Sequence, residues 1–249
     1  MRVAAPKSAG SAVHTTETIS VVFVVDQDNS VRTSLEPLIR SQGWQVLTFE
    51  SASQFLAFPR VAVPCCLLLD FALPDLNGLD LQQRVSDRCD MPVIFITYQT
   101  DVPTTVKAMK AGALECLIKP LQTAHLLTAI GSALDRSRAI QSQEAAVRIL
   151  RERFASLSPR EVEVMALVVS GWLNKEVGAA LGISEVTVKV HRFNVMRKMK
   201  ADSFADLVKF STTLRLTAVP RDDRPSGRSF GTRSPTVRVP QAEPSIVAP

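Results

Sequence analysis

The sequence has no apolar run that approaches the ~20 residues needed to span a bilayer, and its first residues lack the charged, apolar and small-residue order of a signal peptide. We therefore expect a cytoplasmic protein with no membrane partner. The four cysteines have none of the Cys and His spacings of a zinc site, so we expect reduced, mostly buried thiols. No glycine-rich phosphate loop follows the first apolar run, which argues against a nucleotide-using enzyme.

The charge of the 249-residue chain is unevenly distributed. The formal net charge is +5, but residues 19–136 carry −3 and residues 137–211 carry +4. The two ends, residues 1–18 and 212–249, carry +1 and +3. With 46% hydrophobic and 21% charged residues the chain can bury a core, and its length predicts one large or two ordinary domains. The basic second half is the candidate for binding a polyanion.

Five short apolar runs alternate with helical patterns in the first half of the chain. The runs are Ile19–Val25, Val46–Phe49, Cys66–Leu69, Val93–Thr97 and Leu114–Ile118. They are apolar on both faces, as central parallel strands are. Helical spacing occupies Ser30–Gln42, Gly78–Ser86, Pro103–Ala111 and Thr123–Arg136, and Pro37 is expected to kink the first of these helices. The pattern predicts an α/β domain, a doubly wound five-stranded parallel sheet whose ligand site lies at the carboxyl ends of the strands.

These patterns divide the chain into five segments. We expect a flexible N-terminus over residues 1–18 and the α/β domain over 19–136. Residues 137–153 are polar without proline or glycine and predict a helical linker, followed by a small all-α domain over 154–211. Residues 212–249 hold six of the fifteen prolines and six arginines, which predicts a disordered tail.

Polar residues gather at the predicted strand ends. The first strand is followed by Asp26 and Asp28, and the other ends bring Asp70, Thr97 and Lys119. Crowded carboxylates favour a hard divalent cation such as Mg2+, and a carboxylate beside Mg2+ can accept a phosphoryl group. This is phosphoacceptor chemistry, not enzymatic turnover. A simpler alternative for Asp26 or Asp28 is the N-cap of the first helix.

The basic half shows a second pattern. Ser158-Pro159 opens a helix that ends near Ser170-Gly171, a second helix begins near Asn174, and Gly182-Ile183-Ser184 forms a turn before a third helix, Glu185–Met199. The exposed face of the third helix is predicted to carry Lys189, His191, Arg192, Asn194, Arg197 and Lys198. The order predicts a helix-turn-helix that binds double-stranded DNA, although a charged face on an ordinary helical bundle is the alternative. A fourth helix is expected over Ser203–Phe210.

The strand-end residues occur in a familiar order. The segments are Val24-Val25-Asp26-Gln27-Asp28, Leu67-Leu68-Leu69-Asp70 with Pro74 and Gly78, Ile96-Thr97, Asp101-Val102-Pro103, Ala108-Met109-Lys110-Ala111-Gly112-Ala113 and Lys119-Pro120. Over residues 19–136 this order resembles the CheY/flavodoxin-like receiver domain of the FixJ subgroup of two-component response regulators.

That resemblance implies a role for each strand-end residue. Asp70 is the implied phosphoacceptor for a sensor histidine kinase, Thr97 the switch hydroxyl and Lys119 the phosphate partner. Asp26 and Asp70 are the implied Mg2+ ligands, with Gln27 a weak one because the family has an acid there. A second departure is Cys116, where the family has an aromatic residue. The two departures leave a phosphorylation-independent transcription factor as the alternative.

The helical half resembles the DNA-binding domain of the LuxR/NarL/FixJ family. The matching segments are Leu157-Ser158-Pro159-Arg160-Glu161, Asn174-Lys175-Glu176-Val177, Leu181-Gly182-Ile183-Ser184, Thr187-Val188-Lys189-Val190-His191-Arg192, Asn194-Val195-Met196 and Lys198-Met199. The resemblance implies base-reading positions at Lys189, Val190 and Phe193. It implies positions nearer the DNA backbone at Lys175, Thr187, His191, Arg192 and Arg197, with His191 alternatively packed or capping. It also implies a homodimer on activation, with Phe204 and Leu207 on the dimerisation helix.

Overall fold

The computed structural model describes residues 19–86, 88, 90–98 and 102–216. The expected disorder of residues 1–18 and of most of the 212–249 segment therefore lies outside the described residues, and so does Cys89. The chain divides into two compact units, one that ends at Ser142 and one that begins at Gln143. In the described ranges, no helix is both long and apolar enough to cross a membrane.

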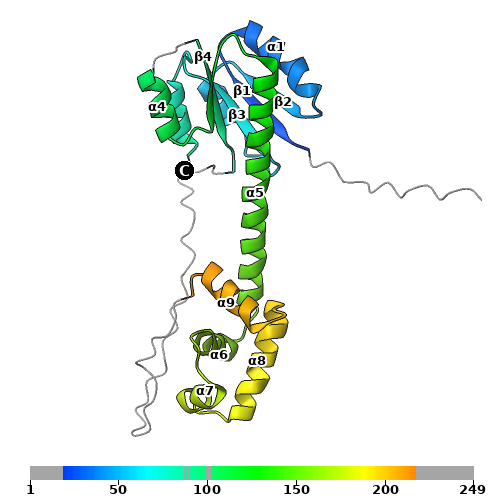
Figure 1. The fold of residues 1–249 in the computed structure, drawn as a ribbon, viewed down its shortest axis with the longest axis vertical. Coiled ribbons are helices and arrows are strands. Elements are labelled where there is room, and N and C mark those ends of the chain that lie inside the picture. Colours follow the sequence, from blue (N-terminus) through cyan, green and yellow to red (C-terminus); the bar gives the residue numbers. More distant parts are fainter. Residues whose placement is uncertain (1–18, 87, 89, 99–101, 217–249) are drawn as a thin grey trace, which may run out of the picture. The chain divides into compact units, whose positions relative to one another are not determined.

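The first unit contains one five-stranded sheet (Figure 1). Its strands are β1 (Val21–Val25), β2 (Gln45–Phe49), β3 (Cys65–Asp70), β4 (Val93–Thr97) and β5 (Glu115–Ile118). All pairings are parallel, and the strand order is β2-β1-β3-β4-β5. This order is that of a doubly wound sheet, which confirms the architecture predicted from the sequence. The order reverses between β1 and β3, which is where such sheets bind their ligands.

Helices cover both faces of this sheet. Leu35 and Ile39 of α1 (Asn29–Arg40) pack with Leu126 and Ile130 of α5 (Thr123–Ala155) on one face. Residues of α2 (Ala52–Ala57), α3 (Gly78–Arg84) and α4 (Val102–Lys110) pack against the other face. Pro37 lies inside α1, which nevertheless continues to Arg40.

The short helix α2 was not predicted. Ser51 caps it by accepting a hydrogen bond from the Gln54 amide. A second acceptor comes from the loop after β3: the Asp75 carboxylate accepts hydrogen bonds from the amides of Ala52, at 3.1 Å, and Ser53, at 2.8 Å. The N-terminus of α2 is thus satisfied by a residue more than twenty positions away, which no local pattern reveals.

The expected free thiols are present where the chain is described. Cys65 and Cys66 are buried in β3, and Cys116 is half-buried in β5. Burial raises the pKa of Cys65 to about 12 and also raises the pKa of Cys66. These thiols therefore stay protonated at neutral pH and behave as small apolar core residues.

The second unit is wholly helical in its described part. The predicted linker is helical, because α5 runs without a break from Thr123 to Ala155. The helices that follow are α6 (Pro159–Val169), α7 (Asn174–Leu181), α8 (Glu185–Met199) and α9 (Phe204–Thr213). The last of these extends beyond its predicted end and into the segment predicted to be a tail.

The start of α6 is fixed by a capping box. Ser158 accepts the Glu161 amide, and the Glu161 carboxylate accepts the Ser158 amide at 2.8 Å. The same carboxylate accepts Lys198 Nζ of α8 at 2.6 Å. Burial by itself would raise the pKa of Glu161, but Lys198 and the Ser158 amide hold it below its usual value. One carboxylate therefore caps α6 and ties it to α8.

Candidate functional site

Three of the predicted strand-end residues meet in a buried ion cluster. Lys119 Nζ lies 2.6 Å from Asp26 Oδ2 and 3.5 Å from Asp70 Oδ2. The Lys119 side chain is 3% exposed, Asp26 is fully buried and Asp70 is 5% exposed. One ammonium thus joins two carboxylates that would otherwise repel each other.

The strand register brings these residues together. Val25 and Leu69 are direct partners in β1 and β3, so the residues that follow them, Asp26 and Asp70, lie side by side at the carboxyl end of the sheet. Gly78 allows α3 to start close behind Asp70, because a Cβ at this position would lie 2.6 Å from the Asp70 carbonyl oxygen. At the other side of the site, the Lys119 amide donates to the Thr97 carbonyl at 2.8 Å.

The negative charge of Asp70 is only partly compensated by its surroundings. Burial, and then the negative charge of Asp26, raise the pKa of Asp70, while Lys119 lowers it in part. Asp26 is better satisfied, because its Oδ1 accepts the Asp28 amide at 2.8 Å and its Oδ2 accepts Lys119. Asp70 is therefore the less stabilised carboxylate and the one nearer the surface. Thr97, predicted as the switch residue, is 3% exposed at the end of β4.

Asp28 and Gln27 follow β1 but lie outside the ion cluster. Asp28 is the N-cap of α1 and accepts the Ser30 amide at 2.8 Å and the Ser30 hydroxyl at 2.6 Å. Those hydrogen bonds lower its pKa. The capping alternative is therefore confirmed for Asp28. Gln27 is exposed at the rim beside Asp26.

The donor set fits a hydrated Mg2+. In the described part of the chain, no group of three or more His, Cys, Asp or Glu side chains is placed to hold a metal ion. Mg2+ commonly keeps several waters and uses only one or two protein carboxylates. Asp26 and Asp70 are the two carboxylates that could hold such an ion, and the Gln27 amide oxygen is a neutral third candidate. The missing charge at Gln27 predicts weak binding.

Sequence reasoning missed two residues at this site. Arg32 Nη1 of α1 donates to the Asp26 carbonyl at 2.6 Å, and the ring centre of Tyr98 lies 4.7 Å from Lys119 Nζ. The only sequence signal for Tyr98 is its position directly after Thr97. Cys116 has no aromatic ring to contribute to the site. Burial raises the pKa of its thiol, which forms a hydrogen bond with the Thr105 side chain of α4.

The turn between α7 and α8 has the geometry expected of a helix-turn-helix. Gly182 caps α7 at φ +65°, a left-handed conformation that suits glycine, and Ser184 caps α8 by accepting the Thr187 amide at 3.1 Å. A Cβ at Gly178 would lie 2.7 Å from the Ile183 carbonyl oxygen, so α7 and the turn touch through backbone. Val177 and Val188 are buried in the core between these helices.

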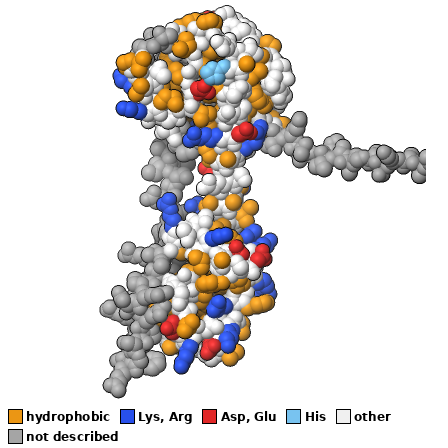
Figure 2. All heavy atoms as spheres, viewed as in Figure 1, with side chains coloured by type: hydrophobic (Ala, Val, Ile, Leu, Met, Phe, Trp, Pro, Cys, Tyr) orange, Lys and Arg blue, Asp and Glu red, His pale blue; other side chains and the backbone are white. Residues whose placement is uncertain are grey.

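One face of α8 remains uncovered. Val190 is 54% exposed, Phe193 is 66% exposed, and Val186, one turn earlier, is 69% exposed. The Lys189 side chain is 61% exposed and pairs with Glu185 of the preceding turn at 3.1 Å. Figure 2 shows Lys and Arg side chains among hydrophobic ones on this unit. All three residues predicted to read bases therefore lie on an exposed face that is both cationic and apolar.

The side chains predicted nearer the DNA backbone differ in how firmly they are held. Lys175 at the start of α7 is exposed. Arg197 Nη2 donates to Asn194 at 3.3 Å, and its guanidinium lies 6.0 Å from the centre of the Phe193 ring. The Thr187 hydroxyl bonds with that of Ser184 at 2.8 Å.

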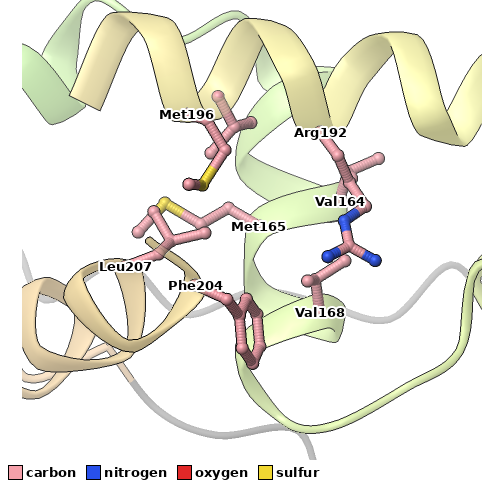
Figure 3. Close-up of a pocket in the computed structure, with 8 residues that line it drawn as sticks. Val164, Met165, Val168, Arg192, Met196, Phe204 and Leu207 are labelled. Atoms are coloured by element: carbon pink, nitrogen blue, oxygen red, sulfur yellow. The ribbon is translucent and has the colours of Figure 1, made fainter. Parts of the chain in front are cut away.

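Arg192 is the most constrained of this set. Its Nη1 donates to Asn174 Oδ1 of α7 at 2.7 Å, and its guanidinium lies 5.7 Å from the centre of the Phe204 ring. Figure 3 shows Arg192 and Phe204 among the residues that line a small, mostly apolar pocket between α6, α8 and α9. Leu207 lines the same pocket and is 3% exposed, whereas Phe204 is 42% exposed. Of the two residues predicted for dimerisation, Phe204 is thus the one whose side chain is exposed and can contact another chain.

His191 faces the interior of its unit. It is half-buried, and its Nδ1 is buried with no hydrogen-bond partner among the described residues. The packed alternative for His191 agrees with this position better than a contact with the DNA backbone.

The same two regions match known family models. Residues 22–131 match the response regulator receiver domain, and residues 155–211 match the bacterial regulatory proteins of the luxR family. The chain is 44% identical over 211 residues to nodulation protein W of Bradyrhizobium diazoefficiens, an alignment that covers 84% of this chain and 93% of that protein. It is 40% identical to the transcriptional regulatory protein FixJ of Azorhizobium caulinodans, over 81% of this chain and 95% of that protein.

A solved structure is also similar. The response regulator StyR matches with a TM-score of 0.70 at 42% sequence identity, over 78% of this chain and 98% of that chain.

Proposed function

The chain belongs to the two-component response regulators that join a receiver domain to a LuxR-type DNA-binding domain, and from this premise we propose that Asp70 accepts a phosphoryl group from a histidine kinase and thereby controls DNA binding. We assign the receiver to residues 19–136, the linker to 137–153 and the DNA-binding domain to 154–211, with flanking segments 1–18 and 212–249. A regulator of this kind acts where the DNA is, in the cytoplasm.

The observation that carries the proposal is the single ammonium shared by two buried carboxylates. Lys119 lies closer to Asp26 than to Asp70, and the pKa of Asp70 is raised by burial and by Asp26. A phosphoryl group on Asp70 would carry more charge than the carboxylate and offer oxygens to the ammonium. Lys119 would then exchange part of its contact with Asp26 for the phosphoryl group.

The chemistry at Asp70 is a single group transfer. A carboxylate oxygen of Asp70 attacks phosphorus, the bond between phosphorus and the donor atom breaks, and the donor leaves with the electron pair. Lys119 and Thr97 stabilise the phosphoryl oxygens, and Asp26 keeps the ammonium in place. Mg2+, when bound by Asp26, Asp70 and weakly by Gln27, supplies positive charge to the phosphoryl oxygens.

The output is DNA binding by a dimer. Lys189, Val190 and Phe193 lie on the exposed face of α8, the helix that a helix-turn-helix places in the major groove. Phe193 has no hydrogen-bonding group, so it reads shape or a thymine methyl group. Lys175, Thr187, Arg192 and Arg197 serve the DNA backbone, and Phe204 contributes to the contact between two chains. Two half-sites are then bound cooperatively.

Phosphodonor treatment followed by three measurements on one sample tests the proposal. With acetyl phosphate and Mg2+, the full-length chain is expected to gain a label on Asp70, to increase in mass to that of a dimer and to bind DNA more tightly. Asp70→Ala should remove all three responses. Equal DNA affinity with and without the donor would instead support a phosphorylation-independent factor, the alternative that the sequence departures at Gln27 and Cys116 left open.

A further inference from the structure

An aromatic ring covers the ammonium group of the ion cluster. Tyr98, the chain's one tyrosine, follows Thr97 directly, and its ring centre lies 4.7 Å from Lys119 Nζ. The face of an aromatic ring is electron-rich and attracts a cation at this distance. Lys119 Nζ is therefore held by three groups: the carboxylates of Asp26 and Asp70 and the ring of Tyr98.

The ring is the outermost of these groups. Tyr98 is 66% exposed, whereas the Lys119 side chain is 3% exposed and Asp26 is fully buried. An ammonium group at the edge of a sheet is normally hydrated, because lysine keeps its charged end in water. Here the ring occupies the solvent side of the ammonium. Loss of the ring would admit water next to Lys119 and Asp70.

We propose that Tyr98 is a positioning residue that covers the Lys119 ammonium and thereby slows the loss of the phosphoryl group from Asp70. This rests on the proposed function, because it requires that Asp70 be phosphorylated. In the reaction that Tyr98 slows, a water oxygen attacks phosphorus and the bond between phosphorus and the Asp70 oxygen breaks. The carboxylate recovers the electron pair, inorganic phosphate leaves, and the proton lost by water passes to solvent or to a phosphate oxygen.

The ring acts in two ways in this proposal. It keeps water from the space beside the ammonium, and it strengthens the pairing of Lys119 with phosphoryl oxygens because a dry cation attracts them more strongly than a hydrated one. Neither effect needs the phenol hydroxyl. Phenylalanine should therefore replace Tyr98, whereas alanine should not.

The lifetime of the phosphoryl group tests this directly. The full-length chain and its Tyr98→Phe and Tyr98→Ala variants are labelled with acetyl phosphate and Mg2+, the donor is removed, and the label on Asp70 is followed over time. Tyr98→Ala should lose its label about fivefold faster than the parent chain, which is the rate change expected for removal of one contact of this class. Tyr98→Phe should stay within about twofold, on the same scale.

Two outcomes overturn the proposal alone: Tyr98→Ala that keeps the parent lifetime, or Tyr98→Phe that decays as fast as Tyr98→Ala. Failure of the parent chain to take up any label at Asp70 overturns the proposed function as well, so the two failures are distinguishable.

A second measurement needs no phosphorylation. Because the chain has one tyrosine, incorporation of fluorotyrosine gives a single fluorine resonance from Tyr98. Lys119→Met removes the ammonium from the ring face and should shift that resonance. Arg160→Met, a change in the second unit, is the matched control and should leave it unchanged. A fluorine chemical shift that does not change in Lys119→Met would overturn the contact on which the proposal depends.

Discussion

Lys119→Met provides the sharpest test of the buried ion cluster. Methionine keeps an unbranched apolar side chain but removes the ammonium, so Asp26 and Asp70 face each other without a cation. Breaking a buried ion pair by removing one partner typically costs about 3–5 kcal/mol. We expect the low end, about 3 kcal/mol, because the pKa of Asp70 is already raised and this carboxylate can take up a proton, which removes the repulsion. That loss corresponds to a factor of roughly one hundred in the opening equilibrium of the sheet.

Hydrogen exchange in the full-length protein measures this loss locally. The amides of Val24 and Val25 lie in β1, an interior strand paired on both sides, so they exchange when the sheet of the first unit opens and do not report on the second unit. The control is the double variant Asp26→Asn with Lys119→Met. It leaves one carboxylate and should recover at least about half of the lost free energy.

The pH dependence adds a second requirement. The pKa of Asp70 is already raised by burial and by Asp26, and Lys119 is the group that opposes this rise. In Lys119→Met the native state therefore binds more protons than the unfolded state, so stability must fall as pH rises through the interval between the unfolded and native pKa values of Asp70. The deficit should be largest at neutral pH and shrink in acid. A loss below about 1 kcal/mol, or one that is equal at about pH 5 and about pH 8, would refute the reasoning.

Four further outcomes follow from other contacts. Gln27→Asp should raise Mg2+ affinity about tenfold in a titration, because it adds a carboxylate at the rim of the site. Lys189→Ala should weaken binding to DNA and lower the slope of log affinity against log salt by about one, because one phosphate contact is lost. Replacing thymine by uracil in a bound half-site should cost about 1 kcal/mol in the parent chain but nothing in Phe193→Ala, because uracil lacks only the methyl group. Glu161→Gln should destabilise the second unit by about 1 kcal/mol at neutral pH, through weaker bonds to Lys198 and the α6 cap. Because the native pKa of Glu161 is lowered, this difference should disappear as pH falls through that value.

Each of these outcomes has a clear contrary result. Unchanged Mg2+ affinity would remove Gln27 from the metal site, and an unchanged salt slope would remove Lys189 from the DNA interface. Equal sensitivity of the parent chain and of Phe193→Ala to uracil would show that the phenyl ring does not contact the methyl group. A stability difference between the parent chain and Glu161→Gln that persists in acid would show that the negative charge of Glu161 does not cause it.

Much of the fold could be predicted because the strands are apolar on both faces. The run Val93–Thr97 coincides with its strand. The order of the strand ends also predicted that Asp26, Asp70 and Lys119 lie close together, as the ion pairs confirm. The capping residues Ser158 and Ser184 were also predictable, because each cap uses atoms a few positions away.

Features that depend on distant partners could not be predicted. Asp28 and Asp26 both follow β1, and spacing alone does not reveal that one caps a helix while the other is buried against Lys119. The position of Tyr98 directly after Thr97 does not reveal its contact, because that contact is made with Lys119 at another strand end. Arg192 was predicted to lie near the DNA backbone, but its bond to Asn174 could not be predicted because it depends on how α7 packs against α8.

The Asp75 bonds to Ala52 and Ser53 have a consequence for the order of folding. Helix α2 is far shorter than the ~12–15 residues at which an isolated helix becomes even marginally stable in water, so it cannot persist before its N-terminus is capped. One of its caps arrives only when the loop after β3 reaches its native place. Helix α2 should therefore form late, after β1 and β3 have paired. The Ser53 amide therefore reports on the loop that follows Asp70. Any change that displaces this loop breaks the Ser53 hydrogen bond to Asp75 and should speed hydrogen exchange at the Ser53 amide.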